Sequence, residues 1–120
     1  PLFFPGTPAW RTRREDFDLL VKELVSDLIR RWPQVATIEF AVEDVPPSDP
    51  APWEPHNVVV ARVFPADRRR ALRDRIVVYR LPIVQRCPAE EVAATTRRVL
   101  VERISHILAL PPDEIDDALA

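Results

Sequence analysis

Proline and glycine occur very unequally in this chain, and the imbalance limits what it can fold into. Fourteen prolines occur among 120 residues, whereas glycine occurs only at Gly6. Because proline donates no backbone hydrogen bond and disrupts the interior of helices and sheets, we expect the prolines to divide the chain into short elements. A single glycine excludes the glycine-rich loops that bring the backbone close to nucleotide phosphates, since those loops need several glycines.

The rest of the composition is typical of one folded domain rather than of a disordered chain. Hydrophobic residues make up 47% of the sequence and charged residues 30%, which is the ordinary globular mixture. Seventeen basic and 19 acidic side chains give a net charge of −2. This balance argues against binding through bulk charge to nucleic acid or to a membrane surface, and we expect neither as a partner.

The cysteine content and the first residues bear on metal chemistry and location. Cys87 is the only cysteine, so neither an intrachain disulfide nor a cysteine-based zinc site is expected. No apolar run approaches the roughly 18 residues that span a bilayer. The first residues lack the basic region and long apolar stretch of a signal peptide, and we therefore expect a cytoplasmic protein.

The first third of the chain predicts a lead-in followed by a helix. Residues 1–13 are too rich in proline for a regular helix, and we expect them to form an extended lead-in to a domain over residues 14–120. In residues 14–31, apolar side chains recur at spacings of three and four, which makes one apolar stripe on a helix. Thr12 is the expected N-cap, and Pro33 is expected to end the helix.

The remaining patterns predict a small sheet followed by two more helices. The expected elements are strands at 35–42, 57–64 and 75–81, a long helix at 88–110 and a short helix at 113–119. The third strand is a continuous apolar run, which predicts an interior position, and Pro82 is expected to end it. This order predicts an α+β domain. Its sheet of about three strands is packed by the N-terminal helix, the long helix and the short C-terminal helix.

Three aromatic residues are candidates for an interaction surface. Phe4 and Trp10 lie in the lead-in, and Trp53 lies in a proline-rich loop at 43–55. These side chains are too apolar for free segments, so they either pack on the domain or contact a partner. The partner that we expect is an unidentified protein or peptide.

Several other reactive side chains have simpler interpretations. Cys87 precedes a helix, but nothing in the sequence places His56 or His106 beside it, so we interpret it as structural. Glu43 and Asp44 end the first strand. If that strand continues, they point to opposite sides and only one of them can face a cleft.

A run of arginines occupies the connection between the second and third strands. It comprises residues 68–70 and Arg73, and it is either a solvated connection or a patch for phosphate or an acidic partner. Asp67 and Asp74 partly neutralise it, and no aromatic residue interrupts it. These features favour the solvated connection.

One spacing in the long helix has the geometry of a metal site. Glu102 and His106 are one turn apart on the same helical face. In the HExxH motif this spacing places two ligands on a zinc ion, and the glutamate between them is the general base. In this chain Glu102 holds the first ligand position and Arg103 holds the position of the base.

Three segments together resemble the minimal zincin-like metallopeptidase family of bacteria, in its actinobacterial form. After an amphipathic helix that ends near Trp32, they are residues 38–46 (IEFAVEDVP), 75–83 (RIVVYRLPI) and 100–110 (LVERISHILAL). The resemblance extends over residues 12–119. It implies a zincin-like fold, a zinc cofactor and metallopeptidase activity.

The residues at the functional positions of that family differ in this chain. The resemblance places the first zinc histidine on Glu102 and the general-base glutamate on Arg103, and only the second histidine is kept, as His106. The glycine that follows the motif falls on Ala109. The acidic third ligand is expected near Asp113.

This degenerate motif leaves two interpretations of function. In the first, the domain is catalytically inactive, uses no cofactor and works as a binding or regulatory module, with Glu102 and His106 paired to each other. In the second, the chain is a metal-dependent peptidase whose zinc is held by Glu102, His106 and Asp113. Losing a general base costs about 10²–10⁴-fold in rate, and Arg103 adds a positive charge beside the cation. We therefore favour the first interpretation.

Overall fold

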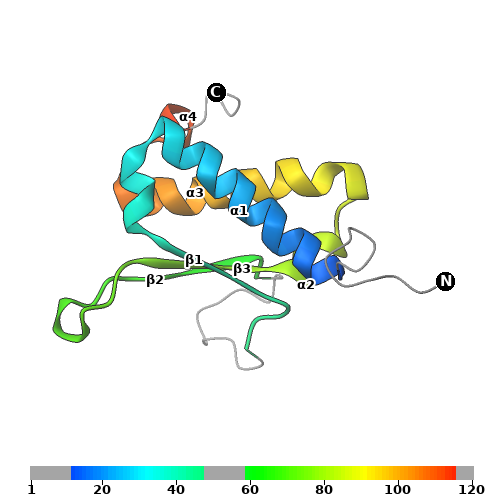
Figure 1. Cartoon of the computed structure of the whole chain (residues 1–120), viewed down its shortest axis with the longest axis horizontal. Coiled ribbons are helices and arrows are strands. Elements are labelled where there is room, and N and C mark those ends of the chain that lie inside the picture. The colour runs from blue at the N-terminus through cyan, green and yellow to red at the C-terminus, as the bar shows by residue number, and fades with distance from the viewer. Residues whose placement is uncertain (1–11, 48–58, 116–120) are drawn as a thin grey trace, which may run out of the picture.

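The computed structural model describes residues 12–47 and 59–115 and has helices packed on a small sheet (Figure 1). Its helices are α1 (Arg13–Arg31), α2 (Arg80–Val84), α3 (Val92–Leu108) and α4 (Pro112–Ile115). Its strands are β1 (Glu39–Glu43), β2 (Ala61–Phe64) and β3 (Arg75–Tyr79). Three 3₁₀ turns complete it, namely η2 (Pro33–Thr37), η3 (Arg68–Arg70) and η4 (Ala89–Glu91). The predicted α+β class is confirmed.

The first helix forms where its cap and apolar stripe predict. The Thr12 hydroxyl accepts a hydrogen bond from the backbone N–H of Glu15 at 3.0 Å, which satisfies one of the free donors at the helix start. Phe17, Val21 and Leu28 are buried along one side. The helix ends at Arg31, and Pro33 begins the 3₁₀ turn η2.

The sheet has the strand order β1-β3-β2. β1 runs parallel to β3, and β2 runs antiparallel to it. The central strand is buried on both faces, since Ile76 and Val78 are 0% exposed and Val77 and Tyr79 are at most 5% exposed. The interior position predicted for this strand is therefore confirmed.

The predicted strand boundaries are less accurate. The strand expected at 35–42 begins only at Glu39, because residues 33–37 form η2. Val35, at the start of the expected strand, is out of phase with the alternating Ile38, Phe40 and Val42, and it is buried as part of the 3₁₀ turn η2. Of the strand expected at 57–64, only Ala61–Phe64 is a strand among the described residues.

The end of the third strand is also a correction. The strand stops at Tyr79, and the residues up to Val84 form the short helix α2. Pro82, expected to end the strand, lies within the first turn of that helix. There a missing backbone N–H breaks no helical hydrogen bond, because the first N–H groups of a helix have no partner within it.

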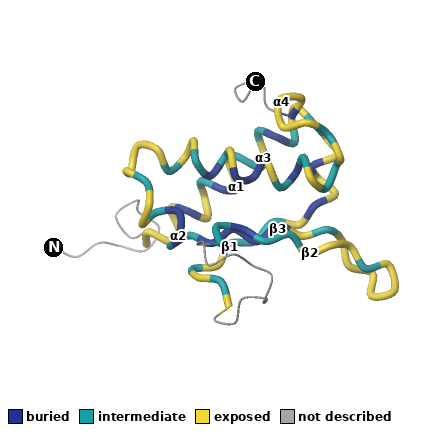
Figure 2. The backbone as a smooth tube through the Cα atoms, turned by 180° about the vertical axis from the view of Figure 1, so that it is seen from behind, coloured by how far each residue is buried: buried dark blue, intermediate teal, exposed yellow. Residues whose placement is uncertain are grey.

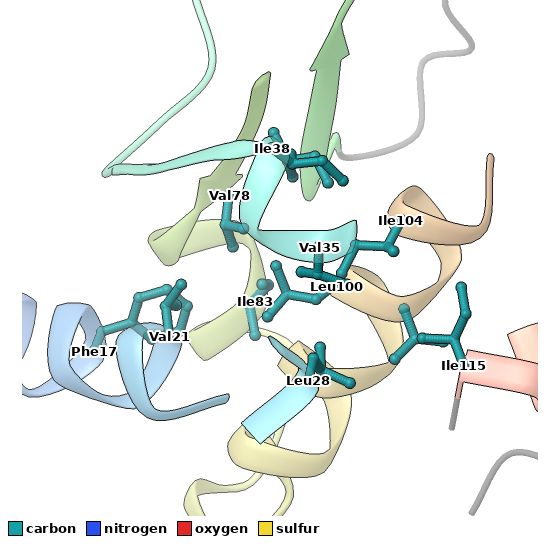
Figure 3. Close-up of a cluster of buried hydrophobic side chains, with 12 residues drawn as sticks. Phe17, Val21, Leu28, Val35, Ile38, Val78, Ile83, Leu100, Ile104 and Ile115 are labelled. Carbon is teal, nitrogen blue, oxygen red and sulfur yellow. The ribbon is translucent and has the colours of Figure 1, made fainter. Parts of the chain in front are cut away.

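The helices and the sheet enclose one apolar core. α1 and α3 lie over the same face of the sheet (Figure 1), and the buried residues line the sides that face each other (Figure 2). Val35, Ile83 and Leu100 meet in the middle of the core, and Ile115 of α4 closes it near Ile104 (Figure 3). Among the described residues, no helix combines the length and the apolar character needed to cross a membrane.

Candidate functional site

The segment compared with HExxH, residues 102–106, has its polar side chains on the solvent side of α3. Glu102 and His106 are exposed, and Arg103 is partly buried. Leu100 and Ile104, which alternate with them along the helix, are 0% exposed and face the core. We refer to Glu102, Arg103 and His106 as the motif face.

Within the motif face, the arginine neutralises the glutamate. Arg103 Nη1 lies 3.6 Å from Glu102 Oε2. The pairing expected between Glu102 and His106 is not formed, and the structure shows no hydrogen bond or ion pair between these two side chains. The Glu102 carboxylate is thus engaged by the Arg103 guanidinium.

The side chains in the described part of the chain do not fit a zinc ion. Residues 12–47 and 59–115 contain no group of three or more His, Cys, Asp and Glu side chains placed to hold a metal. Asp113, the expected third ligand, is exposed in α4, and it is not gathered with Glu102 and His106 into such a group. A zinc site needs at least three protein ligands that converge on one point.

The turn after α3 keeps a backbone shape that suits glycine. Ala109 caps the helix with φ at 55° in the left-handed region, and the N–H of Leu110 donates to the carbonyl of Ser105 at 3.1 Å. Glycine is the preferred residue for such a cap because it lacks the Cβ that the left-handed region crowds. The position where the resemblance places glycine therefore requires a conformation that disfavours alanine.

A second polar group lies where the parallel strands end. Arg80 Nε donates to Asp44 Oδ1 at 3.0 Å, and the Arg80 side chain is only 14% exposed. Arg14 of α1 lies 3.6 Å from Asp44 and 4.0 Å from Glu43. We refer to Arg14, Glu43, Asp44 and Arg80 as the strand-end cluster. It ties α1, the end of β1 and the start of α2 together.

The condition under which Glu43 and Asp44 would point to opposite sides, a strand that continues through both, is not met. β1 ends at Glu43, so the strict alternation of a strand no longer applies at Asp44. The Asp44 carbonyl instead accepts the backbone N–H of Leu81 at 3.0 Å. Two of the three segments that carry the family resemblance, residues 38–46 and 75–83, are therefore joined here by both side chains and backbone.

A groove of about 780 Å³ runs between α1, α2 and the start of α3. Phe17, Leu20 and Val84 are among its apolar walls, and no residue of the motif face lines it. Cys87 also lines it, and its thiol lies 3.5 Å from the Thr95 hydroxyl. This groove is thus separate from the motif that the sequence singled out.

A smaller groove of about 340 Å³ lies between α1 and β1. Val21 and Val25 of α1 line one side, and Phe40 and Val42 of β1 line the other. Asp18, Lys22, Ser26 and Ala41 complete its walls. We refer to this hollow as the β1 groove.

The arginine run lies in the loop that extends beyond the helices, between β2 and β3 (Figures 1 and 2). Asp67 accepts the backbone N–H of Arg69 at 3.1 Å and lies 3.9 Å from Arg70 Nε. Asp74 accepts the N–H of Ala66 at 3.0 Å. Both acids thus stabilise the loop, which agrees with its interpretation as a solvated connection.

An ion pair joins the two long helices. Arg97 Nη1 of α3 donates to Asp27 Oδ2 of α1 at 2.8 Å, and Arg30 donates to the other oxygen at 3.1 Å. These two hydrogen bonds hold the pKa of Asp27 below its ordinary value of 3.8, and the bond from Arg97 has the larger effect. The sequence analysis did not single out this pair.

Some predicted residues have no structural description. Phe4, Trp10, Trp53 and His56 lie outside residues 12–47 and 59–115, so the expected interaction surface stays a prediction. Conversely, sequence analysis missed Arg14 and Arg80. Each of them lies near the end of an expected helix or strand, and this position was the only hint in the sequence. A pair such as Asp44 and Arg80 is far apart in the sequence and follows no repeating pattern that would reveal it.

Comparison with known proteins identifies the family of this chain. The sequence profile of a family described as zincin-like metallopeptidase matches residues 35–119. That range contains both segments joined at the strand-end cluster and the whole motif face. No significant match was found among curated proteins. Because the profile covers well over half of the chain, the protein belongs to the zincin-like metallopeptidase family.

Proposed function

We propose that this zincin-like domain has no peptidase activity and works as a binding or regulatory module. The observation that carries the proposal is the ion pair between Arg103 and Glu102, 3.6 Å apart at the positions of the family's general base and first zinc ligand. The proposal includes a cytoplasmic location and a protein or peptide partner.

The charge at the motif face supports a loss of hydrolysis. A metallopeptidase needs a carboxylate that removes a proton from the metal-bound water, and losing such a base costs about 10²–10⁴-fold in rate. A guanidinium offers hydrogen-bond donors and no acceptor, so Arg103 does not replace the carboxylate as a base. It also competes with a cation for the Glu102 carboxylate.

The preserved scaffold supports a role in binding. The core and the strand-end cluster hold the helices and the sheet together without any contribution from the motif face. The 780 Å³ groove and the β1 groove offer apolar surface for a partner. Phe4, Trp10 and Trp53 are further contact candidates.

The proposal is tested by hydrolysis of a mixed peptide library with the purified chain, with zinc added and with a chelator. We expect no cleavage under either condition. The matched control is the double variant Glu102→His and Arg103→Glu, which restores the HExxH sequence and shows whether the assay detects activity in this scaffold.

Cleavage by the unchanged chain that zinc supports and the chelator abolishes would contradict the proposal. It would favour the alternative in which Glu102, His106 and Asp113 hold a metal. Zinc-dependent thermal stabilisation of the unchanged chain would point in the same direction.

A further inference from the structure

β1 is an edge strand of the sheet formed by residues 12–47 and 59–115. The order β1-β3-β2 leaves β1 at the edge of the sheet, and among the described residues it pairs with β3 alone. An edge strand presents a row of backbone N–H and C=O groups that a further strand can join.

The hydrogen-bond pattern identifies which groups face outward. The N–H of Glu39 donates to the Asp74 carbonyl at 2.9 Å, toward β3. Since backbone groups alternate in direction along a strand, Phe40 and Val42 direct theirs to the free edge. The contact from Arg14 Nη2 to the Val42 carbonyl at 3.3 Å agrees with this direction.

The β1 groove lies directly beside these outward groups. Phe40 and Val42 contribute both the outward backbone groups and one apolar wall, and Val21 and Val25 of α1 form the opposite wall. A strand that pairs with β1 would place every second side chain over this groove. The site therefore favours an extended segment with apolar residues at alternate positions.

The other face of β1 carries two carboxylates, one of which, Glu43, also lies 4.0 Å from Arg14, and these carboxylates favour one class of occupant. Glu39 and Glu43 are exposed there. In an antiparallel pairing of two copies that joins Phe40 to Val42 of the second chain, Glu39 would lie opposite Glu43 twice, and like charges directly opposite each other are destabilising. Basic side chains at those positions would be favourable instead.

We infer that β1 accepts an extended peptide of alternating apolar and basic residues, which joins the sheet as a fourth strand. The inference rests on the proposed binding function and names its partner class. The apolar side chains enter the β1 groove, and the basic side chains lie beside Glu39 and Glu43. Arg14 covers one carbonyl at the far end of the edge, so pairing centres on Phe40 and the N–H of Val42.

The test is an NMR titration of the ¹⁵N-labelled full chain with the peptide acetyl-Arg-Val-Arg-Val-Arg-Val-amide. We expect the amide signals of Phe40 and Val42 to shift most. The control peptide, with Glu in place of each Arg, should bind about tenfold more weakly or less. Equal affinity for both peptides, or no shift at Phe40 and Val42, would overturn the inference.

Two changes test the backbone pairing itself. The variant Val42→Pro removes the outward N–H at an edge position that tolerates proline, and it should weaken binding about tenfold. A peptide in which alternate backbone amides are N-methylated lacks the donors needed to pair with β1, so it tests the pairing with the protein unchanged. Undiminished binding in the second test contradicts the inference even if the proline variant fails to fold.

The outcomes for the two proposals are distinguishable. Peptide-induced shifts confined to residues of the 780 Å³ groove would overturn pairing at β1 and leave the proposed binding function standing. Metal-dependent cleavage of the bound peptide would overturn the proposed function, while shifts at Phe40 and Val42 would still support pairing at β1.

Discussion

The strand-end cluster and the motif face are both polar, and both lie in segments that carry the family resemblance, but they differ in how they are held. In the strand-end cluster, Arg80 is 14% exposed and binds a carboxylate from a strand 36 residues earlier. In the motif face, the Glu102 side chain is 49% exposed, and within the described residues its carboxylate pairs with its neighbour Arg103. The strand-end cluster connects separate elements of the fold, whereas the motif face lies on the surface of a single helix.

This difference shows that the fold and the chemistry of a zincin-like domain depend on different residues. The core and the strand-end cluster need partners from distant segments, so changing one member disturbs several elements. The motif face needs none of these partners, so its residues can change while the helix is kept. The scaffold of this domain therefore does not depend on the residues of the motif face.

The largest expected difference in the free energy of unfolding is between substitutions on the buried side and on the solvent side of α3. Leu100→Ala should lower the free energy of unfolding by about 2–5 kcal/mol, because it leaves a cavity among fully buried side chains. Glu102→Ala on the solvent side should change it by about 0.5 kcal/mol or less. Urea unfolding of both variants measures the contrast. Equal losses would show that the motif face is part of the structural support.

The second-largest expected effect on the free energy of unfolding comes from the strand-end cluster. Arg80→Ala should lower the free energy of unfolding by about 1–2 kcal/mol, between the values typical of an exposed pair and of a charged hydrogen bond. The matched control is Arg70→Ala, which removes a side chain 78% exposed and 3.9 Å from its partner and should have almost no effect. A neutral Arg80→Ala would mean that the cluster does not stabilise the junction of β1 and α2.

Replacing the residue that caps α3 should increase stability. Ala109→Gly is expected to raise the free energy of unfolding by roughly 1 kcal/mol, because it relieves a left-handed alanine. The control Ala94→Gly, inside the same helix, should lower it by roughly 0.5–1 kcal/mol. Thermal unfolding of the two variants compares them, and destabilisation by both would contradict the cap geometry.

The smallest expected effect depends on pH. Because the pKa of Asp27 is lowered in the folded chain, its pairing stabilises the fold above the unfolded pKa, and this contribution is lost as the pH falls through the folded value. Asp27→Asn should therefore be less stable than the unchanged chain at pH 7, and the difference should shrink as the pH falls below the ordinary value of 3.8 and vanish only below the lowered pKa of the folded chain. A difference that is constant from pH 7 to pH 2 would exclude this account.

The sequence predicted the local features of the fold better than its junctions. α1 was predictable because its cap, its apolar stripe and its terminating proline all lie within the helix or beside it. The change from β3 to α2 was missed because residues 80–84 are mostly apolar and continue the strand pattern, so Pro82 was interpreted as a terminator. Local propensity gives no information about the backbone bond from Leu81 to Asp44 that accompanies this junction.

In the candidate site, too, local features could be predicted from the sequence and contacts between distant residues could not. Glu102, Arg103 and His106 could be singled out from the sequence alone, because the one-turn spacing that was compared with HExxH is local. The pairing of Arg103 with Glu102 instead of Glu102 with His106 depends on side-chain geometry. The β1 groove required knowledge of which strand lies at the edge of the sheet, and this order is set by contacts between segments distant in the sequence.

The most direct test of the central claim is the zinc content of the unchanged chain, measured by elemental analysis after exposure to excess zinc and extensive dialysis. An arginine at the general-base position, paired with Glu102, predicts far less than one zinc per chain. One tightly held zinc per chain, lost on replacement of His106 by alanine and released by a chelator, would contradict it.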